Sequence, residues 1–369
     1  MDQERLSLLA LHFVPGIGDF LIKQLVSYCG SAQDVFKLSE GKLLKIPNVG
    51  GVTVAALKSA DPFDLAEKEL RKAERHDTKL LFYYDSEYPA RLKQFDDCPS
   101  LLYVKGDVNL NTSRTAGIVG TRQATPYGKE MVEQIVRDLV PLQTMIISGL
   151  AYGIDIHAHK EALKNNLPTL GVMGSGIDVI YPALHKEVAK RMMENGGLAT
   201  ENPFGAKPDA HNFPARNRII SAMSDVLIVV EAAEKGGALI TAEIANSYNK
   251  DVFAIPGAVG QTFSEGCNKL IKINKAHLMT SVKDIEYIMN WKSEGPIEEQ
   301  VTQLDLNLFD QDERVVVDIL KEKKTPIMID ELSRRTAISP SVLASLLLSL
   351  EFKNVVKSLP GKMYKLNKH

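Results

Sequence analysis

Short apolar runs alternate with helical patterns through the middle of the chain, from Thr115 onward. The runs are continuously apolar, and they lie at residues 116–119, 145–147, 170–173, 198–199, 226–230 and 252–255. Buried strands separated by amphipathic helices are typical of a parallel sheet that is covered on both faces. The pattern therefore predicts an α/β fold whose core is a Rossmann-like, doubly wound, mostly parallel sheet.

Nearly every one of these runs ends in glycine or in a hydroxyl-bearing residue. The turns that follow are Gly120-Thr121, Ser148-Gly149, Gly174-Ser175-Gly176, Thr200 and Pro256-Gly257. In doubly wound sheets, ligands bind beyond the carboxyl ends of the strands, where helix N-termini and free backbone N–H groups favour anions. We therefore expect the turns to form a phosphate-binding edge.

Two similar segments precede the sheet, at Val14–Gly18 and Ile46–Gly50, and each lies between helical patterns. They predict an N-terminal helical domain of the helix-hairpin-helix or SAM-like kind. The N–H groups of such a hairpin can contact a DNA phosphate. The alternative is a tight turn between two helices, with an apolar residue that fills the core.

The last part of the chain has the element order of a winged helix. Three helical patterns at 313–321, 329–335 and 340–352 precede two alternating strands at 355–358 and 363–366. Residues 311–369 contain eleven Lys and Arg against seven Asp and Glu, a net charge of +4. The third helical pattern has no basic or amide side chain, so we expect this module to bind a protein or pack internally rather than read bases.

These patterns divide the chain into four expected parts. They are a helical domain at 1–61, a connector plus Rossmann-like DNA-binding core at 62–291, a polar and acidic linker at 292–310, and a winged helix at 311–369.

Composition narrows the function classes. The net charge of −2 gives no overall attraction to a polyanion, so binding of nucleic acid requires a local concentration of Lys and Arg. Three cysteines without CxxC spacing argue against a disulfide framework or a zinc site. The chain has neither a signal-peptide pattern nor an apolar stretch of bilayer-spanning length, so we expect a cytoplasmic protein.

The stretch His211–Ile220 gathers two arginines, two asparagines and an aromatic residue. Guanidinium groups suit phosphate oxygens, and Phe213 is interpreted either as a base-stacking face or as a plug beneath the loop. Arg216 and Arg218 are two residues apart, so on a helix they cannot share one face. One is expected to meet DNA while the other braces the fold.

The sequence gives little support for a catalytic site or a metal site. Asp155, His157 and His159 suggest a metal, but steps of two on a helix point the histidines apart, while Asp155 and His159 are placed to pair. A capping or pairing role is therefore favoured over a metal site. Glu201, Glu231 and Glu243 are not accompanied by a Ser-His-Asp order, a Walker lysine or a GxGxxG motif. We expect no catalytic residue, no cofactor and no metal.

Several motifs together resemble the DNA processing protein A family, also called DprA or Smf. They are Gly120-Thr121-Arg122, residues 148–155, residues 174–178 with Tyr181-Pro182, residues 213–218, Glu231-Ala232, residues 237–242 and residues 253–257. They span roughly Tyr88 to Thr280 in family order. Two departures occur: the family's Gly-Ser-Arg is Gly-Thr-Arg here, and its Ser-Gly-Ser is Gly236-Gly237-Ala238.

The resemblance implies a cytoplasmic protein that binds single-stranded DNA, protects incoming DNA and helps to load the RecA recombinase during natural transformation. It also implies a homodimer formed through the Rossmann-like core. The residues expected to contact DNA are Gly120, Thr121, Arg122, Ser148, Gly149, Gly174, Ser175, Lys207, Phe213, Arg216, Asn217 and Arg218.

Two other functions stay open. Residues 236–243 faintly resemble the Gly-Gly-x-Gly-Thr-x-x-Glu signature of phosphoribohydrolases acting on nucleoside monophosphates, which requires a glycine where Leu239 stands. A nucleotide-sensing scaffold is the third hypothesis, but it leaves Arg122 and the arginines of residues 216–218 unexplained.

Overall fold

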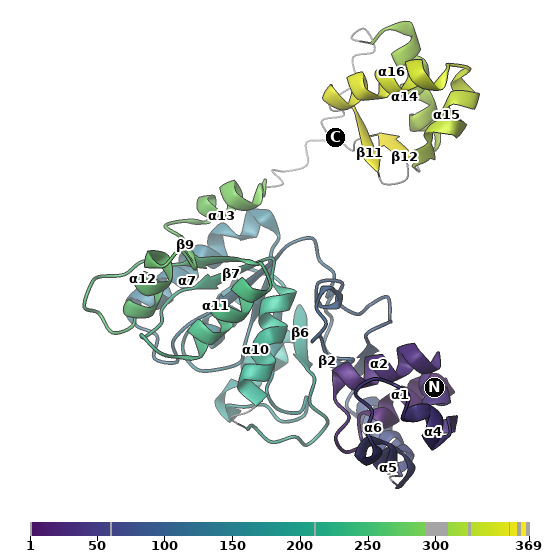
Figure 1. The fold of residues 1–369 in the computed structure, drawn as a ribbon. Helices are drawn as coiled ribbons and strands as arrows, with labels where there is room; N and C mark the ends of the chain where they lie inside the picture. Colours follow the sequence, from purple (N-terminus) through teal and green to yellow (C-terminus); the bar gives the residue numbers. More distant parts are fainter. Residues whose placement is uncertain are drawn as a thin grey trace. The chain divides into compact units, whose positions relative to one another are not determined.

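The computed structural model describes residues 2–59, 61–209, 212–292, 309–323, 326–353, 355–359 and 363–366. The chain forms two compact units, Met1–Ser293 and Glu294–His369. Figure 1 labels the helices and strands of both. The predicted linker falls largely outside the described residues, as do His211 and the turn at Pro360-Gly361.

The first unit begins with six helices. They are α1 (Gln3–Leu11), α2 (Asp19–Cys29), α3 (Ala32–Lys37), α4 (Glu40–Leu43), α5 (Gly51–Ser59) and α6 (Pro62–Arg75). Asp2 caps α1, because its side chain accepts a hydrogen bond from the Glu4 N–H. Leu8, Leu9, Ile22 and Leu25 are fully buried and form the centre of this helical part.

The two predicted hairpins are tight turns between helices. Gly16 has a φ of 78°, which glycine adopts without strain. The apolar residues of both turns are buried: Val14, Ile17, Ile46 and Val49. The turns therefore supply core residues to the helical part, as the second interpretation of these segments expects.

A nine-stranded, mostly parallel sheet follows. Its strands are β1 (Lys79–Phe82), β2 (Leu101–Lys105), β3 (Thr115–Val119), β4 (Met145–Ser148), β5 (Thr169–Val172), β6 (Gly196–Thr200), β7 (Val226–Val229), β8 (Asp251–Ala254) and β9 (His277–Leu278). The order across the sheet is β1-β2-β6-β5-β4-β3-β7-β8-β9. The chain thus builds outward from β3 in one direction and then from β7 in the other, which confirms the doubly wound prediction.

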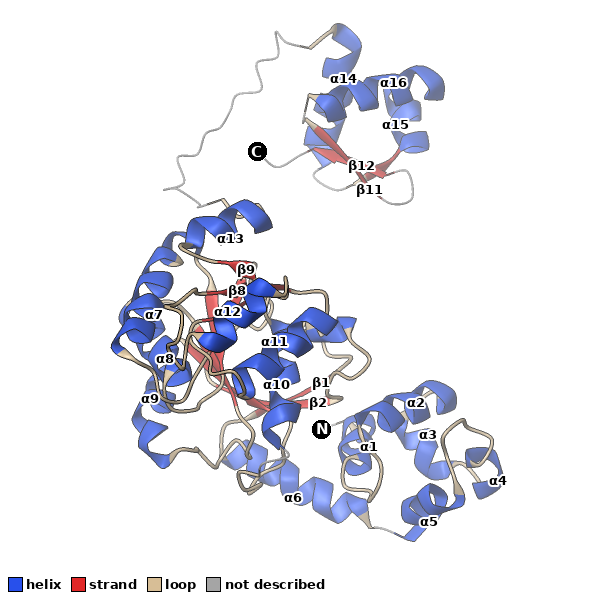
Figure 2. Ribbon diagram, turned by 60° about the vertical axis from the view of Figure 1, so that its left-hand side comes forward, coloured by secondary structure: helices blue, strands red, loops and turns tan. Residues whose placement is uncertain are grey.

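Helices cover both faces of the sheet (Figure 2). Helices α7 (Pro126–Asp138), α8 (Ile154–Lys164) and α13 (Val282–Met289) bury apolar side chains on one face. Helices α10 (Asn212–Met223), α11 (Gly237–Ser247) and α12 (Glu265–Lys272) do so on the other. Helix α9 (Lys186–Met192) joins the cluster that also contains the N-terminal helices. The start of α7 is strongly specified by the sequence, because Thr125 caps the helix and Pro126 occupies its first position.

Strands β1 and β2 were not predicted. They come from the connector, and they are antiparallel to each other, as β2 is to β6. Strand β2 pairs with β6, which is almost a hundred residues away in sequence, and a local pattern cannot indicate such a contact. Strand β9, at the opposite edge, has only two residues and is too short to show a pattern of its own.

The second unit is a winged helix with its own apolar core. Its elements are α14 (Gln311–Lys323), β10 (Ile327–Met328), α15 (Ile329–Thr336), α16 (Pro340–Phe352), β11 (Val356–Leu359) and β12 (Met363–Leu366). This confirms the predicted order and adds β10, which pairs with β12. Across the described parts of both units, no helix combines the length and the apolar character needed to cross a membrane.

Candidate nucleic-acid interface

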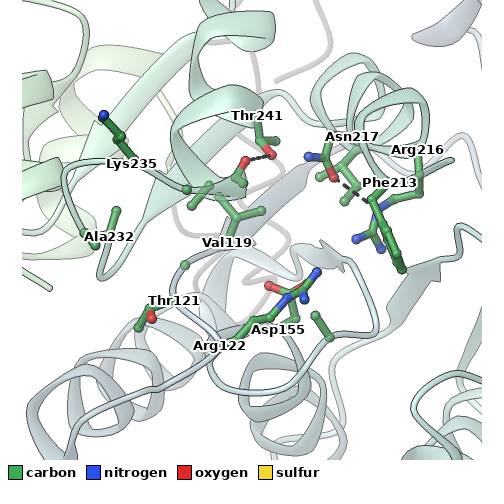
Figure 3. A pocket seen from close by; sticks show the side chains of 17 residues that line it. Val119, Thr121, Arg122, Asp155, Phe213, Arg216, Asn217, Ala232, Lys235 and Thr241 are labelled. Atoms are coloured by element: carbon green, nitrogen blue, oxygen red, sulfur yellow. Dashed lines mark hydrogen bonds between the residues drawn. The ribbon is translucent and has the colours of Figure 1, made fainter. Parts of the chain in front are cut away.

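A cavity of about 250 Å³ lies where the strand order reverses, at the carboxyl ends of β3 and β7. The Thr121 N–H donates to the Glu231 carbonyl at 2.7 Å and ties the two strand ends together. Figure 3 shows Arg122 and Asp155 on one side of the cavity and Phe213, Arg216 and Asn217 on another. The cavity therefore occupies the position where doubly wound sheets bind ligands.

Arg122 is the exposed cation of this cavity. It follows β3 directly, and its guanidinium carbon lies 5.6 Å from the centre of the Phe213 ring. Within the described residues it makes no hydrogen bond and no ion pair. Its donors are therefore available to an anionic ligand, while the ring contact holds the side chain over the cavity.

Arg216 is held very differently. It is 6% exposed, and its Nη1 donates to the Val172 carbonyl at 2.5 Å while its Nε donates to Asn217 Oδ1 at 3.1 Å. Burial raises the pKa of Asp155, in the first turn of α8, and the nearby Arg216 guanidinium opposes that shift. Burial likewise lowers the pKa of Arg216, and Asp155 opposes the change. The two groups thus stabilise each other's charge in the lining of the cavity.

Gly149 makes this packing possible. A Cβ atom there would lie 2.3 Å from Arg216 Nη1 and 2.4 Å from Asp155 Oδ2. No side chain fits between those groups without moving one of them. The glycine after β4 therefore serves the packing of Arg216 and Asp155.

A second cavity, of about 100 Å³, adjoins the first. Both are lined by Arg122, Ala151, Phe213 and Arg216, so they form one continuous depression, which we call the groove. The second part is also lined by residues that follow β4 and β5, and by one residue of the loop after β6: Leu150, Tyr152, Met173, Gly174, Ser175, Tyr181, Pro182 and Pro208. The groove thus crosses the carboxyl ends of β3, β4 and β5.

Three aromatic rings line the groove, those of Phe213, Tyr181 and Tyr152. Phe213 lines both cavities, and the Tyr181 ring, which is 52% exposed, lies 6.4 Å from it between centroids. Both arginines of the groove approach the same Phe213 ring, Arg216 at 6.0 Å. The ring is neither a deeply buried plug nor freely exposed, so part of its surface faces the groove.

The N-terminus of α11 completes the cavity. Lys235, Gly236 and Gly237 line it, and Gly236 caps the helix without a side-chain hydrogen bond. Unsatisfied N–H groups and the helix dipole attract anions at such an end. Lys235 is exposed and, among the described residues, makes no hydrogen bond or ion pair. Sequence reasoning missed this lysine, although a lysine directly before the glycines that open a helix was the signal.

The structure separates several of the predicted DNA contacts from the groove. Arg218 lines neither cavity; it pairs with Glu201 and donates to the Asp97 carbonyl, and it lies 3.6 Å from Asp19 of α2. Lys207 is exposed and lies outside both linings.

The two predicted serines are sequestered. The Ser148 hydroxyl donates to the Ile118 carbonyl at 2.6 Å, and the Ser175 hydroxyl donates to the Val179 carbonyl at 2.7 Å. Ser175 still lines the groove, as do Gly120, Thr121, Arg122, Gly174, Phe213, Arg216 and Asn217.

The acidic and histidine candidates have structural partners. His159 does not pair with Asp155: its Nε2 lies 2.7 Å from the Gly149 carbonyl and its Nδ1 lies 2.7 Å from the Thr169 hydroxyl. Burial lowers the pKa of His159 to about 4, so the ring is neutral at physiological pH.

The three glutamates considered as catalytic groups are also engaged. Glu201 pairs with Arg218, Glu231 accepts from the Thr125 N–H and hydroxyl, and Glu243 pairs with Lys275. None of the three side chains lines the cavity.

The chain resembles known proteins along most of its length. Residues 79–290 match the family described as DNA recombination-mediator protein A, and residues 301–362 match the DprA winged helix domain. Protein Smf of Synechocystis sp. is 29% identical over 397 residues, which cover 98% of this chain and 99% of that protein. A putative DNA processing protein DprA of Mycobacterium tuberculosis is 31% identical, with coverage of 81% and 80%.

Two solved structures resemble the fold. The X-ray structure of DprA from Streptococcus pneumoniae gives a TM-score of 0.69 at 31% identity, covering 79% of this chain and 99% of that one. DprA from Helicobacter pylori, described for its single-stranded DNA binding mode, gives 0.53 at 29% identity, covering 58% and 97%.

Proposed function

Because the chain belongs to the DNA recombination-mediator protein A family, also called DprA or Smf, we propose that it binds single-stranded DNA in the groove. As a member of that family it is a DNA processing and recombination mediator. The observation that carries the proposal is the groove itself, where Arg122 and Lys235 line the cavity together with the Phe213 ring and the N-terminus of α11, and neither cation forms an ion pair within the described residues.

Each part of the groove suits one part of a nucleic acid strand. Arg122, Lys235 and the N–H groups at the start of α11 supply positive potential for phosphates. Phe213 and Tyr181 offer faces on which bases stack, and a base can reach them only when it is not already stacked in a duplex. No set of paired amide donors and acceptors for reading base edges is present in the lining, so binding should depend little on sequence.

The relatives support the choice of ligand. The Helicobacter pylori protein binds single-stranded DNA, and its fold corresponds to 58% of this chain. The wider role that we propose is protection of incoming DNA, loading of the RecA recombinase during natural transformation, and action in the cytoplasm as a homodimer formed through the Rossmann-like core.

We also propose that the protein has no catalytic activity of its own. The rival hydrolase needs a positioned carboxylate at the ligand, but Glu243 is half exposed, pairs with Lys275 and lies outside the cavity. Incubation with AMP and related monophosphates should release no free base. Base release that disappears in Glu243→Gln would contradict this proposal.

Fluorescence anisotropy with labelled poly-dT and with duplex of the same length tests the binding function. We expect tighter binding of the single strand, with log K falling by about 0.7 per phosphate neutralised for each decade of salt. Lys235→Ala should weaken binding, while Lys283→Ala, an exposed lysine of α13 that lines neither cavity, should not. Equal affinity for duplex, or affinity independent of salt, would contradict the proposal.

A further inference from the structure

Helices α7 and α8 bring three potential metal ligands together, away from the groove. Glu133 comes from α7, and His157 and Glu161 come from α8, one turn apart. One donor atom from each side chain lies within 4.8 Å of the other two. None of the three residues lines the groove, and the DNA-binding function leaves all three unexplained.

One ring nitrogen of His157 has no hydrogen-bond partner among the described residues. Its Nε2 is buried and, within the described residues, makes no hydrogen bond; Thr144 Oγ1 is the other buried side-chain atom of this kind. Leaving such an atom unsatisfied costs free energy, so its position calls for an explanation. Nε2 does face a carboxylate, because Glu133 Oε1 lies 3.4 Å away.

The 3.4 Å between His157 Nε2 and Glu133 Oε1 matches the distance between two ligand atoms that bind the same metal ion. With zinc bonds to nitrogen and carboxylate oxygen of about 2.0–2.2 Å, adjacent ligand atoms of a tetrahedral site lie about 3.3–3.5 Å apart. The distance is long for a hydrogen bond from a ring nitrogen, and the alignment of the two groups does not form one.

Glu161 is placed to supply the third ligand. It is four residues after His157 on the same helix, and this spacing puts two side chains on one face. Its side chain is only 9% exposed, and its present partner is Lys164 at 3.2 Å. The Lys164 side chain is 66% exposed, so it can turn into solvent at little cost when a cation takes its place. Glu133, at 39% exposed, has the freedom to close the remaining gap.

We propose that Glu133, His157 and Glu161 bind a divalent transition-metal ion such as Zn²⁺ or Co²⁺, with water in the fourth position. One imidazole nitrogen and two carboxylates are a donor set that zinc accepts, whereas magnesium and calcium prefer oxygen alone. The ion links α7 to α8 and so stabilises the helical face that Asp155 and the groove rest on. This revises the expectation of no metal, because the partners of His157 are Glu161 on the same helix and Glu133 on α7, and not Asp155 or His159.

The proposal is tested with the full-length, untagged protein titrated with Co²⁺. We expect visible absorption bands of a four-coordinate ion, without the thiolate-to-metal absorption that cysteine ligation produces, and a rise in melting temperature. His157→Ala should weaken Co²⁺ binding by about 100-fold or more, because even residues that only support a ligand are worth 10–100-fold.

Two further variants keep the test decisive. Glu133→Gln changes a half-exposed side chain on α7, so it should fold normally and still lose most of the Co²⁺ affinity. His277→Ala is the matched control, because His277 also faces a carboxylate, Asp251 at 3.2 Å, but belongs to no three-ligand cluster in the described chain. Co²⁺ binding that is absent in the wild type, or unchanged in His157→Ala and Glu133→Gln, would overturn the proposal.

Discussion

At the scale of single residues, Arg122 and Arg216 show how the same side chain serves two purposes in one groove. Arg216 is buried, and its donors are used by Val172 and Asn217. Arg122 is exposed, and within the described chain its donors make no hydrogen bond. A buried guanidinium that is already satisfied shapes the site, whereas an exposed one has donors to offer a phosphate.

Arg122→Ala should therefore weaken single-strand binding by about 1.5–3 kcal/mol, the range for hydrogen bonds to charged groups, and leave the fold intact. Arg122→Lys should recover only part of the affinity, because an ammonium group cannot make the bidentate contact. Anisotropy titrations and thermal unfolding measure the two effects. An Arg122→Ala protein that unfolds would show instead that the residue is a structural brace.

His159 predicts how stability depends on pH. Burial lowers its pKa from 6.5 to about 4, so the unfolded chain takes up a proton below pH 6.5 and the folded chain does not. The stabilisation is present above pH 6.5 and is lost as the pH falls toward 4. Between pH 7 and pH 5 this single residue should account for about 2 kcal/mol of lost stability.

Urea unfolding at both pH values, followed by fluorescence of Trp291, measures this loss. Trp291 is the single tryptophan of the chain and packs against the core of the first unit. The loss of unfolding free energy between pH 7 and pH 5 should be about 2 kcal/mol smaller in His159→Gln than in the wild type. His277→Gln, at an exposed site, should behave like the wild type. An unchanged pH dependence in His159→Gln would show that other groups are responsible.

At the scale of elements, α10 distributes its two arginines between function and architecture. Arg216 faces the groove, and two residues later Arg218 points to Glu201, the Asp97 carbonyl and Asp19. The helical period of 3.6 residues makes this division unavoidable for positions two apart. Arg218 thereby joins the sheet, the connector and helix α2.

Arg218→Met should lower the free energy of unfolding by about 2 kcal/mol, because Glu201 would lose the partner that offsets its burial. Single-strand affinity should stay within about threefold, a change of less than ~0.7 kcal/mol. Arg71→Met is the control, since Arg71 pairs with Glu67 on an exposed helix face and should cost about 0.5 kcal/mol or less. A loss of affinity with unchanged stability would return Arg218 to the DNA contacts.

At the scale of the whole molecule, the groove and the winged helix belong to different compact units. All groove residues lie within Met1–Ser293, and the winged helix has a core of its own. The exposed face of α16 carries Ser341, Val342, Ser345, Leu348 and Phe352, so it offers hydroxyl groups but no guanidinium, ammonium or amide group to base edges.

A shortened chain ending at Lys292 should therefore stay folded and keep its single-strand affinity within about threefold. Anisotropy of the shortened and full chains under the same salt conditions measures the difference. A large loss would mean that the wing lysines Lys357 and Lys365, or Lys353, supply phosphate contacts.

The sequence by itself determined the elements that have a local signal. Uninterrupted apolar runs, glycine turns and helix caps indicate the central strands and helices of the sheet and the order of the winged helix, because these depend on neighbours a few residues apart. The position of Arg122 and Phe213 at the ligand edge was predicted in the same way, because residues that follow a strand or open a helix lie at that edge in a doubly wound fold.

Only the tertiary structure decided which side chains meet. In the structure the charge partner of Asp155 is Arg216, and His159 instead contacts the Gly149 carbonyl. Arg218 pairs with Glu201, and Lys235 lines the groove. The same holds for β1 and β2, whose pairing with the sheet depends on β6. Such contacts join residues tens to more than a hundred positions apart, and burial, charge compensation and strand pairing across those distances leave no periodic trace in the sequence.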